Sequence, residues 1–333
     1  MVLRSVATAE SHPLELVENV DTPIPKGNEV LVRVDVCGVC RTDLHVVEGD
    51  LPPVVPRITP GHEIVGTIVE TGPNVRILSR GERIGIPWLH QTCGRCEYCL
   101  SSRENLCDNK VYTGYTVSGG YSQFALGRED FVFKLPQDRD PEKMAPLLCA
   151  GIIGYRALTV SRPKPGGVIG FFGFGASAHL TLQMASKLGF ETVAYSRNPS
   201  HLELARDLGA SRTVLVPQAE SEAPSLDSAI VFAPSGLVVL QALRELKKGG
   251  VLAIPAVHMD NIPEIDYDKY FFGERKIMSV ESNTREDAKE FLELAQRLEL
   301  ESTTTSRKLE EANEALIDLK HGRVSEAFVL DCN

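Results

Sequence analysis

Apolar and polar positions alternate along much of the first third of the chain. Valine occupies every second position from 30 to 36, and Leu31, Arg33 and Asp35 lie between. A spacing of two predicts a half-buried strand over residues 29–36. A second strand is predicted over residues 64–70, and proline pairs such as Pro52-Pro53 interrupt the pattern. This part of the chain is therefore expected to be rich in β structure.

After residue 151 the pattern changes to short apolar runs that alternate with helical spacing. The runs that predict strands are residues 168–172, 192–195, 213–216, 229–232 and 250–254. Between them, Leu180, Met184 and Leu188 are spaced four apart, and residues 201–208 and 237–246 also fit helices. Strands that alternate with helices predict a parallel, doubly wound sheet.

The last part of the chain adds two helical patterns, at residues 286–298 and 309–319, and a strand at residues 327–330. Residues 219–224 combine small, acidic and proline residues and are expected to form a mobile loop. We find no internal repeat and no low-complexity segment.

Length and composition narrow the possible functions. The chain has 333 residues, enough for two domains, and 43% of them are apolar. A formal net charge of −10 without a long basic run argues against nucleic acid or an anionic membrane as partner. Residues 1–10 do not resemble a secretory signal, and no apolar run approaches the roughly 18 residues of a membrane helix. We therefore expect a cytoplasmic protein.

Four of the eight cysteines are clustered: Cys93, Cys96, Cys99 and Cys107. In a cytoplasmic chain this spacing indicates a metal site rather than disulfides, and four thiolates can surround one ion tetrahedrally. Such a site leaves no open position, so the ion would be structural. The alternative is four reduced thiols without a metal. That is uncommon, because free cysteines rarely gather in a polar loop.

Two further segments and one isolated cysteine suggest chemistry. They are Cys40-Arg41-Thr42-Asp43-Leu44-His45 after a strand, Gly61-His62-Glu63 before another, and Cys149. Taken singly, each has an ordinary structural explanation: a lone histidine with its hydrogen bonds satisfied, or a small core cysteine. Cys37 and Cys40 also form a Cys-x-x-Cys spacing, which is either a redox motif or, as we expect, a core residue beside a functional one.

A glycine-rich turn follows the predicted strand at residues 168–172. Gly173, Phe174, Gly175, Ala176 and Ser177 precede Ala178 in the order Gly-x-Gly-x-x-Ala, between a strand and a helix. In that context the motif predicts a dinucleotide-binding loop whose backbone approaches a pyrophosphate at the helix N-terminus.

Together these segments resemble the zinc-containing alcohol dehydrogenases of the medium-chain dehydrogenase/reductase superfamily, over essentially the whole chain. The resemblance implies an α/β protein with a GroES-like β-barrel catalytic domain and a Rossmann domain with a doubly wound parallel sheet. The catalytic domain would comprise residues 1–151, with a structural zinc lobe at about 90–110, and the Rossmann domain would comprise residues 152–287. Residues 288–333 would return to complete the catalytic domain.

The resemblance also assigns the metal ligands. Cys₂His is the known catalytic ligand set of alcohol dehydrogenases, which implies that Cys40, His62 and Cys149 bind a catalytic zinc with one open position. Asp43 would orient the ligand histidine, and Glu63 would be an acidic residue near the metal. With the four-cysteine lobe, two zinc ions per chain are expected. Polyol dehydrogenases of the superfamily usually have glutamate in place of Cys149, which favours a simple alcohol or aldehyde substrate.

The same resemblance implies a route for the alcohol proton and a pocket wall. Thr42 would take the proton, and His45, as a surface histidine, would pass it to solvent. Trp88 would narrow the substrate pocket, and Arg41 would contact the cofactor pyrophosphate. The sequence departs from relatives at Ala327, where many carry an arginine that assists this binding. Arg41 would then carry more of the contact, or the cofactor would bind more weakly.

Cofactor preference depends on the end of the second nucleotide-fold strand. NAD enzymes usually place an acidic residue there, and this chain has Ser196 and Arg197 instead. A hydroxyl and a guanidinium can bind a 2′-phosphate, with His201 one turn further on. NADP(H) is therefore favoured and NAD(H) stays possible, since Arg197 can also point to water.

The expected function is hydride transfer between an alcohol and its aldehyde or ketone, in a homodimer or homotetramer. One alternative is an NADPH-dependent, cinnamaldehyde-type aldehyde reductase that works mainly in the reductive direction. Another is a cofactor-binding protein without turnover, which would be expected to lack the zinc ligands or the Thr42–His45 relay.

Overall fold

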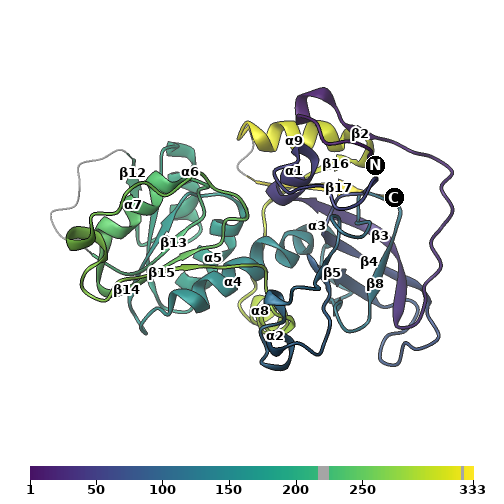
Figure 1. Ribbon diagram of the computed structural model, residues 1–333, viewed down its shortest axis with the longest axis horizontal. Coiled ribbons are helices and arrows are strands. Elements are labelled where there is room, and N and C mark those ends of the chain that lie inside the picture. The colour runs from purple at the N-terminus through teal and green to yellow at the C-terminus, as the bar shows by residue number, and fades with distance from the viewer. Residues whose placement is uncertain (217–224, 324–325) are drawn as a thin grey trace. The chain divides into compact units, whose positions relative to one another are not determined.

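A computed structural model describes residues 1–216, 225–323 and 326–333, and these form two units (Figure 1). The expected mobile loop at residues 219–224 lies outside the described residues. Unit 1 comprises Met1–Cys149, Asn283–Lys289 and Glu301–Asn333, and unit 2 comprises Ala150–Ser282 and Glu290–Leu300. The chain thus returns to unit 1 in two pieces, rather than at one boundary near residue 288.

Unit 2 is built on a parallel sheet of the order β12-β11-β10-β13-β14-β15. Its strands are β10 (Val168–Phe172), β11 (Glu191–Ser196), β12 (Arg212–Leu215), β13 (Leu226–Val231), β14 (Leu246–Ile254) and β15 (Lys276–Ser279). The predicted doubly wound α/β fold is confirmed. β15 was not expected, because its four residues are mostly exposed and lack an apolar run.

Helices connect and flank these strands (Figure 1). They are α4 (Ala150–Ser161), α5 (Ala176–Lys187), α6 (Pro199–Asp207), α7 (Gly236–Glu245) and the π-helical turn η4 (Tyr267–Phe271). α8 (Arg285–Arg297) follows the last strand of this sheet. α4 and α5 pack on one another, where Gly154 leaves room for Thr181. The division between the two units falls inside α8.

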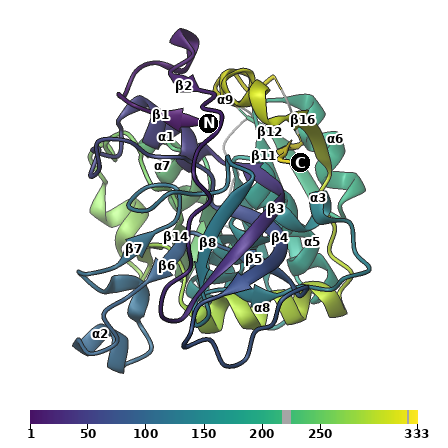
Figure 2. The same ribbon diagram turned by 90° about the vertical axis from the view of Figure 1, so that its right-hand side faces the viewer.

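Unit 1 contains a mainly antiparallel sheet of the order β16-β17-β3-β4-β5-β9, with β8 paired to β3. Figure 2 shows β8, β3, β4 and β5 side by side. The strands are β3 (Glu29–Val39), β4 (Glu63–Thr71), β5 (Arg83–Ile86), β8 (Phe124–Arg128), β9 (Phe133–Lys134), β16 (Thr304–Lys308) and β17 (Ala327–Asp331). β3 continues beyond the predicted end at residue 36, because β17 and β4 still supply backbone partners as far as Val39 and Gly38.

Short elements complete unit 1. They are β1 (Val2–Leu3), η1 (Ala9–Ser11), β2 (Leu14–Glu15), α1 (Arg41–Glu48), β6 (Leu89–Gln91), α2 (Glu97–Leu100), η2 (Glu104–Leu106), β7 (Val111–Tyr112), α3 (Pro141–Met144), η3 (Ala145–Leu148), η5 (Leu309–Glu311) and α9 (Ala312–Lys320). The helix predicted from residue 309 begins as a 3₁₀ turn, in which the Glu311 carboxylate accepts the Lys308 N–H at 2.9 Å.

The core of unit 1 lies against β3 and β4 and includes Cys37, Tyr121 and Phe328. Cys37 is fully buried, which confirms its prediction as a core residue. Within the described ranges, no single helix is long and apolar enough to cross a membrane. Two consecutive helical segments joined by a bend, Pro141–Leu148 and Ala150–Ser161, together have the length and composition of a membrane span, on those two criteria alone.

Candidate active site

Three separate parts of unit 1 bring Cys40, His62 and Cys149 together. Cys40 lies between β3 and α1, where its sulfur accepts the Thr42 N–H at 3.5 Å and caps the helix. His62 directly precedes β4, and Cys149 follows η3. The two Sγ atoms are 3.8 Å apart, and His62 Nε2 lies 3.3 Å from Cys149 Sγ. The three predicted ligand atoms therefore point at one another.

These distances can be compared with a zinc coordination sphere. Zn–S bonds of about 2.3 Å and Zn–N bonds of about 2.0–2.1 Å place two tetrahedral ligands roughly 3.5–3.8 Å apart. The separations around Cys149 match that size. The Glu63 carboxylate completes a group of four residues whose ligand atoms all lie within 4.8 Å of one another. The donor set thus fits a divalent ion such as zinc.

The buried carboxylate of Asp43 organises this group. Its Oδ1 lies 2.9 Å from His62 Nδ1 and accepts the Gly61 N–H at 3.1 Å. Its Oδ2 accepts the Cys40 N–H at 2.9 Å and the Tyr121 hydroxyl at 3.2 Å. An ionised carboxylate only accepts hydrogen bonds, so Nδ1 of His62 carries a proton and Nε2, which faces Cys149 Sγ, is the candidate ligand nitrogen.

Burial and close contact change how these groups titrate. A hydrogen bond with Cys149 holds the pKa of the Cys40 thiol well below its usual value, and the same contact raises the pKa of Cys149. Burial lowers the pKa of His62, but Asp43 outweighs this effect and the net pKa is raised. A thiol whose pKa is lowered ionises more readily, and a thiolate at this position would favour a bound cation.

Glu63 is packed beside the sulfur ligands in a space that a neighbouring glycine provides. A Cβ on Gly38 would lie 1.9 Å from Glu63 Oε2, so no larger residue fits there without displacing the carboxylate. Burial raises the pKa of Glu63 well above its usual value. A buried acid of this kind is charged only when a cation or donor lies nearby.

The two predicted proton-relay residues lie on α1. Thr42 is buried in its first turn. The expected surface position of His45 is wrong, because the side chain is only 11% exposed and Asp50 covers its Nδ1 at 2.8 Å. Arg41 is exposed, and its Nη2 donates to the Leu319 carbonyl at the end of α9 at 3.3 Å.

Trp88 lies against the metal ligands and is itself held by tyrosines. Its ring meets His62 edge-on, with centroids 4.9 Å apart, and is stacked on Tyr112 at 4.5 Å and Tyr115 at 6.0 Å. Sequence reasoning found Trp88 and missed both tyrosines, as well as Tyr121. The available signal was the density of tyrosines between residues 112 and 121. Tyr112 ends the two-residue strand β7 and the other two lie in turns or bends, so they follow no periodic pattern.

The four clustered cysteines form a second candidate metal centre around α2 and η2. Cys93, Cys96, Cys99 and Cys107 have sulfurs within 4.8 Å of one another, with Cys96–Cys99 at 3.5 Å and Cys93–Cys99 at 3.9 Å. Hydrogen bonds from the backbone N–H groups of Arg95 and Cys96 lower the pKa of Cys93 to about 6. Four sulfurs at tetrahedral spacing fit one zinc with no open position.

The glycine-rich turn in unit 2 has the geometry of a phosphate-binding loop. Gly173 has a φ of +89°, and a Cβ there would lie 2.7 Å from the Ala233 nitrogen. Gly175 caps α5, and a Cβ there would have no neighbour within 4 Å. Phe174 is buried, whereas Ala176 and Ser177 form the first helical turn, whose N–H groups have no partner within the helix.

At the end of β11 the structure brings Ser196 and His201 together but leaves Arg197 exposed. Ser196 Oγ accepts the Asn198 N–H at 3.1 Å and lies 3.4 Å from His201 Nδ1. Ala327 is a buried residue of β17 whose N–H donates to the Thr303 carbonyl at 3.0 Å. Its neighbours Val324 and Ser325 are outside the described residues.

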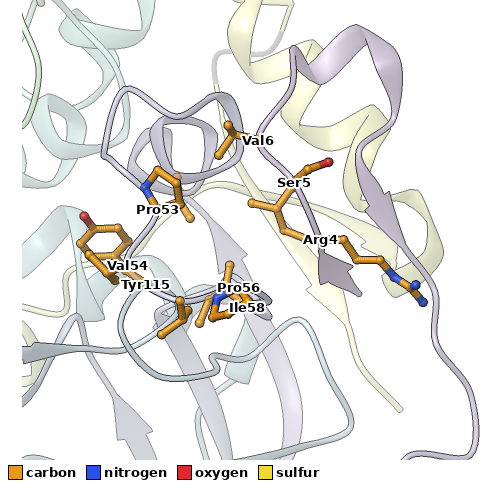
Figure 3. Close-up of a pocket in the computed structure, with 11 residues that line it drawn as sticks. Arg4, Ser5, Val6, Pro53, Val54, Pro56, Ile58 and Tyr115 are labelled. Carbon is orange, nitrogen blue, oxygen red and sulfur yellow. The ribbon is translucent and has the colours of Figure 1, made fainter.

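A further pocket in unit 1 lies apart from this chemistry. It is enclosed by β1, the following residues and the loop after α1, and none of its lining residues is a predicted metal ligand (Figure 3). Tyr115 belongs both to this pocket and to the stack on Trp88.

Comparison with known proteins agrees with this architecture. The family described as alcohol dehydrogenase GroES-like domain matches residues 26–137, and the zinc-binding dehydrogenase family matches residues 178–297. The class is thus a zinc-binding dehydrogenase with a GroES-like unit and a Rossmann-type unit.

Individual relatives narrow this class. A probable alcohol dehydrogenase, AdhA, from Mycobacterium tuberculosis (strain CDC 1551 / Oshkosh) is 44% identical over 98% of this chain and 95% of its own length. An alcohol dehydrogenase from Geobacillus stearothermophilus is 36% identical over 94% of both chains. The solved alcohol dehydrogenase of the archaeon Aeropyrum pernix superposes with a TM-score of 0.87, at 28% identity, over 99% of this chain and 98% of that one. This chain belongs to the zinc-containing alcohol dehydrogenases of the medium-chain dehydrogenase/reductase superfamily.

Proposed function

We propose that this protein interconverts a primary or secondary alcohol and its aldehyde or ketone with NAD(P) as hydride carrier. The observation that carries the proposal is the Cys40–His62–Cys149 group, whose ligand atoms converge while Asp43 holds His62 with Nε2 directed at the two thiols. When bound, zinc would act as a Lewis acid on the substrate oxygen and the nicotinamide would exchange hydride with the carbinol carbon.

The chain's own residues would control orientation and protons. Asp43 fixes the imidazole of His62, and Glu63 adds a carboxylate beside the same ligands. Thr42 would accept the alcohol proton and His45 would pass it on, which suits groups on one helix next to Cys40. Trp88, braced by its tyrosine stack, would form one wall of the substrate site and exclude water.

The four-cysteine lobe would hold a second, structural zinc, which gives two ions per chain. Its four thiols fill a tetrahedron, so no position stays open for substrate. All eight cysteines are free thiols; six belong to the two candidate metal groups, and Cys37 and Cys332 belong to the core of unit 1. The absence of disulfides supports the proposal of a cytoplasmic location.

For the cofactor we propose a preference for NADP(H), with NAD(H) still accepted. Ser196 and His201 meet at the end of β11, Arg197 is exposed beside them, and no carboxylate occupies residues 195–197. A 2′-phosphate would find a hydroxyl and two nitrogen donors there. Solved structures of the same fold include a putative zinc-binding dehydrogenase from Sinorhizobium meliloti bound to NADP, 26% identical, and an acetophenone reductase from Geotrichum candidum in complex with NAD, 25% identical.

Two alternatives differ in what they require of the site. An aldehyde reductase working mainly in the reductive direction would use the same ligands, so kinetics in both directions must separate it from a dehydrogenase. A cofactor-binding protein without turnover would not need convergent thiols or a Thr42–His45 pair. Their presence in one group favours an enzyme.

We also propose a homodimer or homotetramer. β15 is an edge strand of the unit 2 sheet, and exposed apolar side chains lie on or near it, including Tyr267, Phe272 and Met278. An unpaired edge beside exposed aromatics is suited to pairing with a second copy. Sedimentation velocity of the purified protein would give the mass directly.

The decisive test combines metal analysis with a substrate panel run with both cofactors. Wild-type protein should contain about two zinc ions per chain and oxidise small alcohols. Cys149→Ala should lose one zinc and nearly all activity while its melting temperature changes little. Cys96→Ala should instead lower the melting temperature, because the lobe loses its organising ion.

Cys332→Ala is the matched control, since Cys332 is a buried thiol outside both metal groups. It should keep both ions and its activity. Full activity in Cys149→Ala would refute the ligand assignment.

A further inference from the structure

The carboxylate of Asp50 lies directly on the proposed relay histidine. Its Oδ2 is 2.8 Å from His45 Nδ1, and the two side chains are 39% and 11% exposed. An ionised carboxylate can only accept, so His45 carries a proton on Nδ1 and turns Nε2 the other way. On the Nδ1 side of its ring, His45 therefore contacts the carboxylate of Asp50.

Backbone bonds hold Asp50 in this place. α1 ends at Gly49, which has a φ of 84° and donates its N–H to the His45 carbonyl. The Leu51 N–H donates to the same carbonyl at 3.1 Å. The Tyr115 hydroxyl donates to the Pro52 carbonyl at 2.7 Å, and Tyr115 packs beside this loop (Figure 3). Backbone hydrogen bonds at the end of α1 therefore place Asp50 beside His45.

The other charged groups on the elements packed against α1 are paired with one another. Glu10 on η1 pairs with Lys320 and His321, and Lys320 also pairs with Glu48. On α9, Asp318 pairs with Arg307 and Arg323, and Glu314 pairs with His12. On α1 itself, Asp43 binds His62 and Arg41 binds the Leu319 carbonyl. Asp50, by contrast, contacts the His45 ring from the turn that follows α1.

We propose that Asp50 is the positioning residue of the proton relay, fixing the tautomer of His45 and stabilising its protonated form. The inference rests on the proposed dehydrogenase function. During oxidation, hydride leaves the alcohol carbon for the nicotinamide, so the substrate loses two electrons and the cofactor gains them. The hydroxyl proton passes through Thr42 to His45 Nε2, the imidazolium is stabilised by Asp50, and one proton leaves to water.

The test is the pH profile of kcat/KM for alcohol oxidation at saturating cofactor. A negative partner raises the pKa of an imidazole, and the deprotonated form is the one that accepts. Asp50→Asn keeps the shape but removes the charge. It should move the acid inflection to lower pH and slow the reaction near neutral pH about threefold to tenfold, because a weaker base remains.

Asp50→Glu should recover most of the wild-type inflection. Glu48→Gln is the matched control, because it removes a nearby carboxylate on the same helix that accepts the Ala9 N–H and binds Lys320. It should leave the inflection in place. Zinc content and melting temperature are measured for each variant.

The outcomes distinguish a failure of the Asp50 inference from a failure of the proposed proton relay. If Asp50→Asn lowers kcat/KM equally at every pH without moving the inflection, Asp50 is only structural and the inference is wrong. His45→Gln should abolish the inflection, and small buffer bases should restore rate. If His45→Gln leaves the profile unchanged, the relay itself is wrong, while zinc-dependent turnover by the wild type would still stand.

Discussion

Asp43 shows how one side chain can organise a reactive site. A buried carboxylate costs several kcal/mol unless it is paired and hydrogen-bonded. Asp43 receives four donors: the His62 ring, the Tyr121 hydroxyl, and the N–H groups of Gly61 and Cys40. Two of these residues, His62 and Cys40, are proposed ligands, so the bonds that stabilise the charge also set the direction of their candidate metal-binding atoms.

Glycine at position 38 gives a prediction at the same scale. Gly38→Ala would place a methyl group 1.9 Å from Glu63 Oε2 and 2.9 Å from its Cβ, so the buried carboxylate must move. Forced overpacking of this kind typically costs about 1–3 kcal/mol. We expect a lower urea midpoint of unfolding and weaker zinc retention at the Cys40–His62–Cys149 group.

Gly175→Ala is the comparison, because a Cβ there meets nothing within 4 Å and the residue has a φ of −121°. It should leave the midpoint nearly unchanged while weakening cofactor binding at the loop, measured by fluorescence titration of NADPH. Equal midpoints for both variants would contradict the assigned role of Gly38.

Helix termini carry much of the proposed chemistry at the scale of elements. Cys40, a proposed ligand, caps α1 together with Asp43, and the Gly49 turn that follows the helix brings Asp50 to His45. One eight-residue helix and its N-cap therefore carry a proposed metal ligand, the carboxylate that orients His62 and the proposed relay. Side chains on successive turns of one helix keep fixed spacing, so a metal site and a proton path can share one element.

The end of β11 gives the prediction for cofactor choice. Arg197→Ala should raise KM for NADP(H) about tenfold and leave KM for NAD(H) little changed, because a charge-assisted bond is worth roughly 1.5–3 kcal/mol and about 1.4 kcal/mol is tenfold. His201→Gln should have a smaller effect in the same direction. Steady-state kinetics with both cofactors measures this. A higher kcat/KM with NAD(H) in the wild type would overturn the preference.

Each unit of the whole molecule buries a neutral histidine. Burial lowers the pKa of His90 in unit 1 and of His179 in unit 2 to about 4, from a usual value of 6.5. Within the described residues, His90 Nδ1 and His179 Nε2 have no hydrogen-bond partner. Below pH 6.5 the unfolded chain therefore binds protons that the folded chain does not.

Folding stability should accordingly be fully present above pH 6.5 and fall as the pH drops toward about 4. The loss is on the order of 1.4 kcal/mol per pH unit for each histidine. Urea unfolding between pH 7.5 and 5 measures the slope. His90→Gln and His179→Gln should each reduce it by up to one proton, and parallel curves for variant and wild type would show that these histidines do not cause the loss.

The sequence alone determined the features that depend on local spacing. Four cysteines within fifteen positions lie close together in almost any local conformation. The family resemblance pointed to Cys40, His62 and Cys149 as ligands, and the structure brings these three residues into contact. The parallel sheet of unit 2 was also predictable, since buried strands leave apolar runs between helical patterns. Strands such as β15 and β16, which are short and partly exposed, left no such signal.

Only the tertiary structure decided what surrounds each predicted residue. Asp50 reaches His45 because the turn after α1 folds back, and Tyr121 reaches Asp43 across 78 positions of sequence. The space that Gly38 leaves for Glu63 depends on the register between β3 and β4, where the two residues are paired. The contacts of Tyr121 and Gly38 join distant segments whose spacing in sequence is arbitrary, so no periodicity can encode them. Asp50 and His45 are only five positions apart, but they meet through the conformation of an irregular turn, which no periodicity encodes either. Burial of His45, which the sequence presented as a surface residue, follows from the same long-range packing.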